Sequence, residues 1–382
     1  MITKALCPVV VDRESEINRL EDALLSAVRG DGNLTVLSGD AGIGKSRLAT
    51  ELRRRAQRLG ASVMEGGCPE AELAIPYFPF NEAISNYLAG ADLDSLRVRL
   101  GAARRELARL FPQLGDEKAP DAGASDGSQA KLRLYEAVFE LFRIAAATSG
   151  LLLIVEDLHW ADDSTRELLD YIGRRLRSNR ILMLVSYRRD ELHRKHPLLP
   201  TIQGWRRSRL ADFIDLEPLG PEGVGRMVSA IFDEPTRPDT RDFLHARCEG
   251  NPFVLEEILK AALDRGDVYR TGSGWTRKSL VEIRLPETVV DSILLRVERL
   301  TKAQADVLRT ASVLGRSFEY PLLRALCGGE VEDELAALAQ QQLIEVEPGC
   351  RVGLPQKGEV AHGIITHAVD ERVQWHEAPG AL

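Results

Sequence analysis

The stretch GDAGIGKS occupies residues 39–46 and fits the pattern G-x-x-x-x-G-K-S. It follows the apolar run LTVL at residues 34–37 and leads into the amphipathic segment KSRLATELRRRAQRLG at residues 45–60. This order predicts a buried strand, a glycine-rich turn and a helix. In that setting the glycines let successive backbone N–H groups point at phosphate oxygens, and the helix N-terminus adds partial positive charge. The sequence therefore predicts a phosphate-binding loop (P-loop).

The P-loop supplies most of the candidate nucleotide contacts. These are Gly39, Asp40, Ala41, Gly42, Ile43, Gly44, Lys45, Ser46 and the adjoining Arg47. Lys45 would reach the β- and γ-phosphates, and Ser46 would offer its hydroxyl to Mg²⁺. The alternative is a chance glycine turn before a helix, which the flanking strand and helix disfavour. We therefore expect ATP or ADP, with Mg²⁺, as cofactors.

A second candidate group ends the apolar run LLLIVED at residues 151–157. Because Mg²⁺ is a hard cation that prefers oxygen ligands, a P-loop needs an acidic side chain from a neighbouring strand. Glu156 and Asp157 stand in that position, and we expect both to serve as metal ligands and as catalytic residues. Their division of labour between metal and attacking water stays open. The alternative is a solvated strand end.

Short apolar runs alternate with helical patterns in the first half of the chain. Apolar side chains at residues 17, 20, 24 and 28 have helical spacing, and the runs at residues 151–155 and 181–185 read as fully buried strands. This alternation predicts an α/β domain with a parallel sheet that is covered on both faces. The small, polar residues of 112–130 suggest a mobile surface loop.

Helical patterns dominate after residue 217, which divides the chain into four predicted parts. Residues 1–216 would form the P-loop nucleotide-binding α/β domain, 217–285 a helical lid, 286–347 a winged-helix domain and 348–382 an irregular or truncated tail. The winged helix is inferred from three helical patterns at 293–300, 307–314 and 331–339, followed by a strand-like LIEVE at 343–347.

The composition excludes several classes of protein. Among 382 residues, 44% are hydrophobic and 28% are charged, which argues against a disordered or fibrous chain. The net charge of −8 provides no global attraction for nucleic acid or an anionic membrane. The five cysteines contain no C-x-x-C pair, which disfavours a zinc site or a disulfide framework. With no apolar stretch of spanning length and no signal-peptide pattern, we expect a cytoplasmic protein without a membrane partner.

Five segments occur in an order that resembles the STAND branch of the AAA+ ATPases. They are GDAGIGKSRL, IVEDLHWADDSTRELL, LVSYRRDEL, CEGNPFVLEEIL and LPETVVDSILLRVERLT, and the resemblance covers residues 10–347. The match is similar to the ATPase module of large ATP-binding regulators of the LuxR type, a module also fused to some adenylate cyclases and kinases.

The resemblance implies roles for three further residues. Arg188 stands where the family has an arginine that senses the γ-phosphate, although arginines at such places are often simply exposed. Pro252 in GNPF matches a lid proline that packs near the nucleotide, and proline is also sterically favoured at a helix start. Arg13 matches a residue that lies by the adenine, but Asp12 replaces the family glycine before it.

Three functions compete at this stage. The resemblance implies a nucleotide-operated signal-transduction switch that slowly hydrolyses ATP with Mg²⁺, in a regulatory role linked to transcriptional control, with a protein partner or self-association. The alternative is a DNA-binding AAA+ initiator of the origin-recognition type. It is disfavoured because EVEDELAALAQQ at residues 330–341, the third helix of the predicted winged helix, carries four acids and no base. A small-molecule kinase ranks last, because it leaves GNPF and the winged helix without a purpose.

Overall fold

The computed structural model describes residues 7–69, 75–115, 127–271, 274–277, 297, 300–314, 317–340, 343–347 and 351–353. The chain divides into two compact units. The sheet unit comprises Arg13–Asp40 and Lys45–Glu217, and the lid unit comprises Met1–Asp12, Ala41–Gly44 and Pro218–Leu382. The chain therefore passes from one unit to the other directly after Asp12, Asp40, Gly44 and Glu217.

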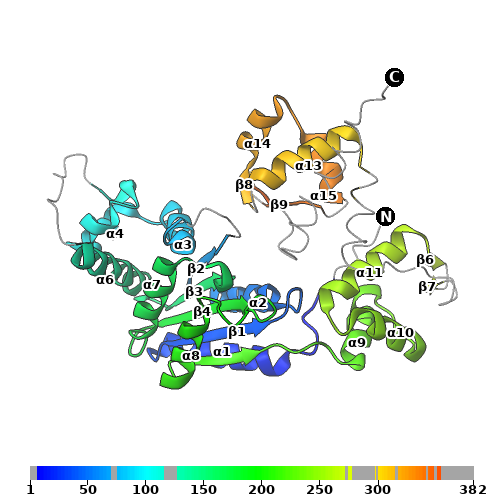
Figure 1. Ribbon diagram of the computed structural model, residues 1–382, viewed down its shortest axis with the longest axis horizontal. Helices are drawn as coiled ribbons and strands as arrows, with labels where there is room; N and C mark the ends of the chain where they lie inside the picture. The colour runs from blue at the N-terminus through cyan, green and yellow to red at the C-terminus, as the bar shows by residue number, and fades with distance from the viewer. Residues whose placement is uncertain are drawn as a thin grey trace. The chain divides into compact units, whose positions relative to one another are not determined.

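The sheet unit is built on five parallel strands in the order β2-β3-β4-β1-β5 (Figure 1). The strands are β1 (Asn33–Gly39), β2 (Ser62–Gly67), β3 (Leu151–Glu156), β4 (Ile181–Arg188) and β5 (Ala211–Asp215). The predicted parallel α/β sheet is confirmed, and the three expected strands are β1, β3 and β4. The two edge strands, β2 and β5, were not expected from the sequence.

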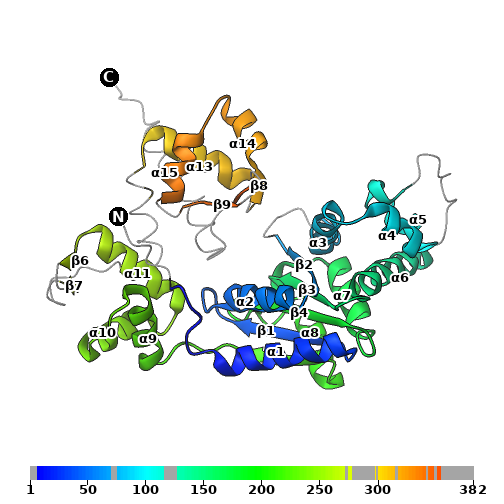
Figure 2. The ribbon, with the colours of Figure 1, turned by 180° about the vertical axis from the view of Figure 1, so that it is seen from behind.

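Helices cover both faces of this sheet (Figures 1 and 2). Helices α1 (Glu14–Arg29) and α2 (Lys45–Arg58) pack on one face, and α3 (Phe78–Ala89), α6 (Gly127–Ala146) and α7 (Asp163–Gly173) pack on the other. Because both faces are covered, the central strands can be apolar along their whole length, and every residue of β4 is buried. Phe142 and Trp205 are among the largest side chains in this core.

Shorter elements complete the sheet unit. They are α4 (Leu93–Leu100), α5 (Ala103–Leu107), η1 (Pro112–Leu114), η2 (Leu158–Trp160) and α8 (Leu199–Ser208). The surface loop expected over residues 112–130 is wrong at both ends. Leu114 is fully buried in the core at the end of η1, and α6 already begins at Gly127. Residues 116–126 of that loop lie outside the described residues.

Within the described part of the lid unit, three helices come first after Glu217. They are α9 (Pro221–Phe232), α10 (Pro238–Cys248) and α11 (Pro252–Asp264), and an antiparallel hairpin of β6 (Val268–Thr271) and β7 (Gly274–Arg277) follows them. Val224, Leu244 and Leu255 contribute one buried side chain from each helix to a shared core. The apolar spacing predicted α9 and α11, whereas α10 and the hairpin were not expected.

The C-terminal part has its own core and a small antiparallel sheet in the order β8-β10-β9. Its elements are α13 (Lys302–Leu314), β8 (Ser317–Glu319), α14 (Tyr320–Cys327), α15 (Glu332–Gln340), β9 (Glu345–Glu347) and β10 (Arg351–Gly353). The predicted helices at 307–314 and 331–339 are present, and most of the one at 293–300 lies outside the described residues. Within the expected irregular tail, β10 is a paired strand, and residues 354–382 lie outside the description. Among the described helices, none has the length and apolar character to cross a bilayer.

Candidate nucleotide site

The P-loop has the local geometry that its sequence predicts. Strand β1 ends at Gly39 and helix α2 begins at Lys45, so the loop joins the carboxyl end of a strand to a helix N-terminus. Gly42 has φ +74° and Gly44 has φ +110°. Side chains with a Cβ atom rarely adopt such values, so the two glycines permit the tight turn. Ser46 and Arg47 lie half-buried on the first turn of α2.

Lys45 is buried at the base of this loop. Only 7% of its surface is exposed, and its Nζ donates to the carbonyl oxygens of Gly39 at 2.9 Å and Asp40 at 3.0 Å. Burial lowers the pKa of Lys45, while the nearby charges of Asp157 and Glu156 act in the opposite direction. The ammonium group is therefore held where water is scarce and where carboxylates from β3 are near enough to influence it.

The two predicted metal ligands lie at the same edge of the sheet as the P-loop. Glu156 is the last residue of β3, and β4 alone separates β3 from β1. Because the strands are parallel, their carboxyl ends share one edge. Asp157 turns the chain with φ +59°, and its N–H donates to the Ser186 hydroxyl of β4 at 3.3 Å. The structure thus brings Lys45, Glu156 and Asp157 together.

Arg188 ends β4 at this edge. It is the register partner of Gly39, and only 7% of its surface is exposed. Its guanidinium forms an ion pair with Glu191 at 3.3 Å, and its central carbon lies 5.3 Å from the centre of the Trp160 ring. The predicted γ-phosphate sensor is therefore positioned one strand away from the P-loop, with its charge held beside a carboxylate and an aromatic ring.

The tip of the P-loop is bonded to the start of α11 within the lid unit. Asn251 donates from Nδ2 to the Ala41 carbonyl at 2.9 Å, and the Phe253 N–H donates to the Gly42 carbonyl at 3.4 Å. Asn251 also caps α11, since its Oδ1 accepts from the Phe253 N–H at 3.0 Å. Pro252 follows as the first residue of the helix. The predicted residue Pro252 is thus next to the side chain that contacts the loop.

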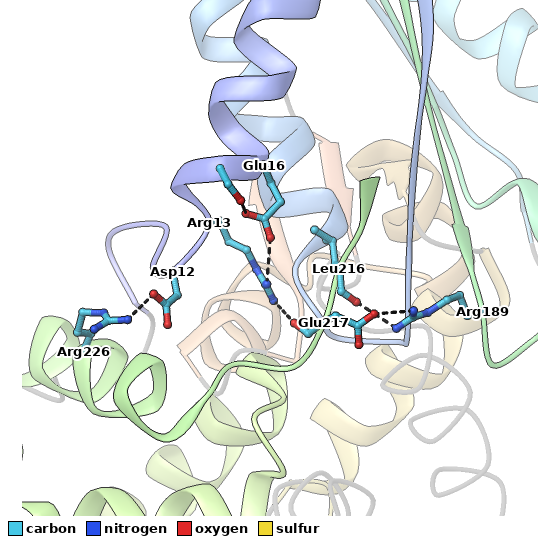
Figure 3. A network of polar contacts seen from close by, with 8 residues as sticks. Asp12, Arg13, Glu16, Arg189, Leu216, Glu217 and Arg226 are labelled. Atoms are coloured by element: carbon cyan, nitrogen blue, oxygen red, sulfur yellow. Dashed lines mark hydrogen bonds and ion pairs between the residues drawn. The ribbon is translucent and has the colours of Figure 1, made fainter. Parts of the chain in front are cut away.

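Arg13 lies at a different place from the other predicted contacts. It precedes α1, is 8% exposed, and donates from Nη2 to the Glu217 carbonyl at 2.6 Å (Figure 3). Its Nη1 also contacts Glu16 at 3.4 Å. The guanidinium of Arg13 therefore lies at the end of the sheet unit, where the chain leaves for α9.

Sequence reasoning missed three residues near the P-loop. The charge of Asp190 acts on Lys45, Asn251 contacts Ala41, and Arg189 forms an ion pair with Asp40 at 3.7 Å. Asn251 carried a usable signal, because asparagine before a helix-initiating proline is a favoured N-cap. Arg189 and Asp190 follow Arg188 in the chain, and nothing in the sequence around them indicates that they lie near Asp40 and Lys45.

The donor set fits a magnesium nucleotide. Ser46, Glu156 and Asp157 offer oxygen ligands, which Mg²⁺ prefers. The buried ammonium of Lys45 and the N–H groups at the start of α2 suit phosphate oxygens. The candidate metal ligands and the candidate phosphate-binding groups thus lie at one edge of the sheet.

Residues 9–185 match the family model of the AAA ATPase domain. An uncharacterized protein of Rhizobium meliloti (strain 1021) is 24% identical over 383 residues, which cover 95% of this chain and 35% of the relative. The chain thus spans about a third of the length of this curated relative.

Two solved structures illustrate what this chain is similar to. The crystal structure of a Signal Transduction ATPase with Numerous Domains protein from Pyrococcus horikoshii, with a tetratricopeptide repeat sensor, aligns with a TM-score of 0.52 at 15% identity, covering 97% of this chain and 46% of that one. The Aeropyrum pernix ORC2 protein aligns with a TM-score of 0.44 at 13% identity, over 98% and 97% of the two chains. Residues 9–185 thus resemble an AAA ATPase domain, and the alignment with the Pyrococcus horikoshii structure agrees with a P-loop NTPase fold.

Proposed function

We propose that this chain binds ATP and ADP with Mg²⁺ at its P-loop and slowly hydrolyses ATP as a nucleotide-operated switch. The observation that carries the proposal is the setting of Lys45. Its ammonium is buried at the base of a glycine turn, and the carboxylates of Glu156 and Asp157 act on it from the end of β3. A buried cation beside hard metal ligands at a helix N-terminus is suited to a magnesium triphosphate.

The residues of the site divide into three roles. The backbone of residues 39–44 and Lys45 hold the phosphates, with Ser46 and Arg47 at the start of α2. Ser46, Glu156 and Asp157 hold the metal, whose charge, when bound, offsets that of the phosphates. Pro252 and Arg13 are the further nucleotide contacts that the family resemblance implies.

Arg188 gives the site a means of distinguishing ATP from ADP. A ligand can shift an equilibrium between two conformations only through unequal affinity for them. A buried arginine at the end of β4 can meet a γ-phosphate that ADP lacks. We therefore assign Arg188 as the sensor that separates the two nucleotide states.

The regulatory part of the proposal rests on the resemblance to LuxR-type regulators. It comprises signal transduction linked to transcriptional control, a cytoplasmic location, and a protein partner or self-association. In this proposal residues 217–285 act as the lid and residues 286–347 as a winged helix that faces protein. The first turn of α15 supports a protein-facing role, because Glu332, Asp333 and Glu334 are all acidic.

Titration calorimetry with ATP and with ADP, each with and without Mg²⁺, tests the nucleotide site. Lys45→Ala should abolish binding, because it removes the buried cation. Arg58→Ala is the matched control, since Arg58 is an exposed cation at the far end of the same helix. Equal, tight binding by the wild type and Lys45→Ala would overturn the site. Binding without turnover would favour a pure switch over a hydrolase.

The origin-recognition alternative makes a different prediction. It requires basic side chains that meet DNA phosphates. The acids at the start of α15, together with Glu330, which accepts from the Tyr320 hydroxyl at 2.9 Å, would repel a DNA backbone. Retention on DNA at physiological salt would favour the initiator, whereas loss of binding at that salt supports the switch.

A further inference from the structure

Arg189 contacts both the start of the P-loop and the chain just after β5. Figure 3 shows its bonds to Leu216 and Glu217. Its Nη1 donates to the Glu217 carboxylate at 2.8 Å, and its Nη2 donates to the Leu216 carbonyl at 3.1 Å. Its Nε lies 3.7 Å from the Asp40 carboxylate. All of these residues belong to the sheet unit. One guanidinium therefore faces two carboxylates, one at the P-loop and the other at the last residue before the lid unit.

The main chain of Arg189 also contacts the start of the P-loop. Its N–H donates to the Gly39 carbonyl at 3.4 Å, which extends the β4–β1 ladder by one residue beyond Arg188. Lys45 donates to the same carbonyl oxygen. Arg189 therefore contacts the start of the P-loop through its main chain as well as through its side chain.

Glu217 is held from a second side by Arg13. While Arg189 bonds its carboxylate, Arg13 donates to its carbonyl at 2.6 Å. Arg13 itself directly follows Asp12, which pairs with Arg226 of α9 inside the lid unit. Arginines thus bond the chain at two of the places where it changes units, after Asp12 and after Glu217.

We propose that Arg189 is a positioning residue that couples the P-loop to the point where the chain enters the lid unit. This proposal rests on the proposed nucleotide-binding function. Nucleotide phosphates bound at the P-loop place negative charge next to Asp40. This charge attracts the Arg189 guanidinium in competition with Glu217 and Leu216, so the bonds of Arg189 to those two residues weaken. Nucleotide binding at the P-loop thereby changes the contacts at the junction after Glu217. The P-loop and this junction are linked by a coupling free energy.

If Arg189 only stabilised the fold, its removal would lower the stability of the protein without changing how the junction responds to nucleotide. The side chains of Glu217 and Asp40 are 68% and 50% exposed, and exposed ion pairs contribute little to stability. Arg189→Ala should therefore fold and melt close to the wild type. Its effect should be seen in how the junction responds to nucleotide, which a loss of stability alone does not change.

Arg19 provides a matched control. From α1 it donates to both carboxylate oxygens of Asp212, at 2.8 and 2.9 Å, and to the Phe213 carbonyl at 2.9 Å. It thus bonds a carboxylate and a carbonyl of β5, as Arg189 does near the end of that strand. Among the described contacts, however, those of Arg19 include neither Asp40 nor Glu217.

Hydrogen–deuterium exchange over residues 211–220 of the full chain tests the proposal, with Mg²⁺-ADP and a non-hydrolysable ATP analogue as the probes. In the wild type, nucleotide should change the exchange rate by about tenfold, within the roughly 5- to 150-fold range of coupled sites. In Arg189→Ala this change should fall below about twofold, although nucleotide still binds. Arg189→Lys should keep part of it, because an ammonium lacks the fork that reaches several partners at once. Arg19→Ala should match the wild type.

The outcomes separate this inference from the proposed function. If calorimetry shows that the wild type binds no nucleotide, the proposed function fails and the coupling fails with it. If the wild type binds nucleotide but Arg189→Ala keeps the full exchange response, or Arg19→Ala loses it equally, only the coupling is overturned. Should Arg189→Ala melt early, Arg189→Lys decides: an unchanged nucleotide response in that variant overturns the proposal, and a reduced response supports it.

Discussion

Gly39 and Arg188 are register partners across the parallel strands β1 and β4. The first residue of the P-loop and the predicted γ-phosphate sensor therefore stand at the same level of the sheet. Since β4 lies between β1 and β3, Arg188 is also interposed between the loop and the strand that ends in Glu156. A guanidinium in this position can respond to a charge that is held between the loop and the acids.

Replacing Arg188 with alanine should selectively weaken the binding of ATP. A charge-assisted hydrogen bond contributes roughly 1.5–3 kcal/mol, which corresponds to about a 10- to 150-fold loss of affinity. ADP binding should change little, because ADP has no γ-phosphate to meet this side chain. Calorimetry with both nucleotides measures the difference. Arg194→Ala, which removes an exposed arginine from the following loop, serves as the control. Equal losses for ATP and ADP would show that Arg188 acts on the fold.

Nucleotide binding should be accompanied by proton uptake at alkaline pH. Burial lowers the pKa of Lys45 in the free protein, so part of its population is neutral below the ordinary lysine pKa. Bound phosphates favour the charged form and raise that pKa, while ATP itself is fully ionised at such pH. Protons are therefore absorbed on binding, and affinity falls as the pH rises through the free-state pKa.

Calorimetry in two buffers that differ in ionisation enthalpy measures this uptake. Lys45→Arg is the control, because a guanidinium remains protonated throughout this range. The wild type should show a buffer-dependent enthalpy that Lys45→Arg lacks. A buffer dependence that is identical in the two proteins would assign the proton to another group and exclude Lys45.

The central strands were predictable from the sequence because they are buried on both faces. Every residue of β3 except the half-buried Glu156 is apolar and buried, so the strand reads as one continuous run. The edge strands carry no such run. In β5 only Ile214 is buried, and Asp212 and Asp215 interrupt the apolar pattern. In β2 the run is interrupted by Gly66, where a side chain does not fit because its Cβ would lie 2.0 Å from the Pro79 carbonyl oxygen.

The same distinction applies to the candidate site. The P-loop is a local motif, so the conformations of Gly42 and Gly44 follow from a short stretch of sequence. The contact between Arg189 and Glu217 joins residues 28 positions apart, which follow the ends of β4 and β5. It depends on the strand order, in which β1 separates β4 from β5, and that order was not available from the sequence. Motifs therefore revealed the chemistry, whereas the connections between them required the fold.

Substituting alanine at Gly42 should destabilise the protein beyond the cost of the backbone conformation. At φ +74°, a Cβ would lie 2.8 Å from the Phe253 Cβ and 2.9 Å from the Asn251 Oδ1. A left-handed non-glycine residue costs roughly 1–2 kcal/mol, and overpacking adds roughly 1–3 kcal/mol. The free energy of unfolding should therefore fall by about 2–5 kcal/mol.

Gly60 is the matched control for this measurement. Its φ of +73° is nearly the same, but a Cβ there would meet only Ser149, at 3.8 Å or more. Gly60→Ala should lose only the conformational part, about 1–2 kcal/mol. Denaturant unfolding of the two variants gives the comparison. Equal losses would indicate that the contact between the P-loop tip and α11 adds nothing to stability.

Neutralising Asp157 should change nucleotide affinity in opposite directions with and without Mg²⁺. Without the metal, the carboxylate repels phosphates, so Asp157→Asn should bind ATP more tightly by about 1 kcal/mol, or roughly fivefold. With Mg²⁺ present, the variant lacks an oxygen ligand and should bind more weakly than the wild type. Calorimetry in Mg²⁺ and in a chelator measures both states. Asp163→Asn removes a charge from the next helix, where the side chain is 87% exposed, and should change neither.

Glu156→Gln, measured in the same way, separates the roles of the two acids. The residue that holds the metal should show the reversal of sign between chelator and Mg²⁺, because its charge repels phosphate in one state and binds the cation in the other. The residue that orients water should leave Mg²⁺-dependent affinity unchanged while turnover falls by at least the roughly 100-fold typical of a lost general base. If neither variant shows the reversal, the strand end at Glu156 and Asp157 is not the metal site, and the P-loop with Lys45 would remain to hold the phosphates.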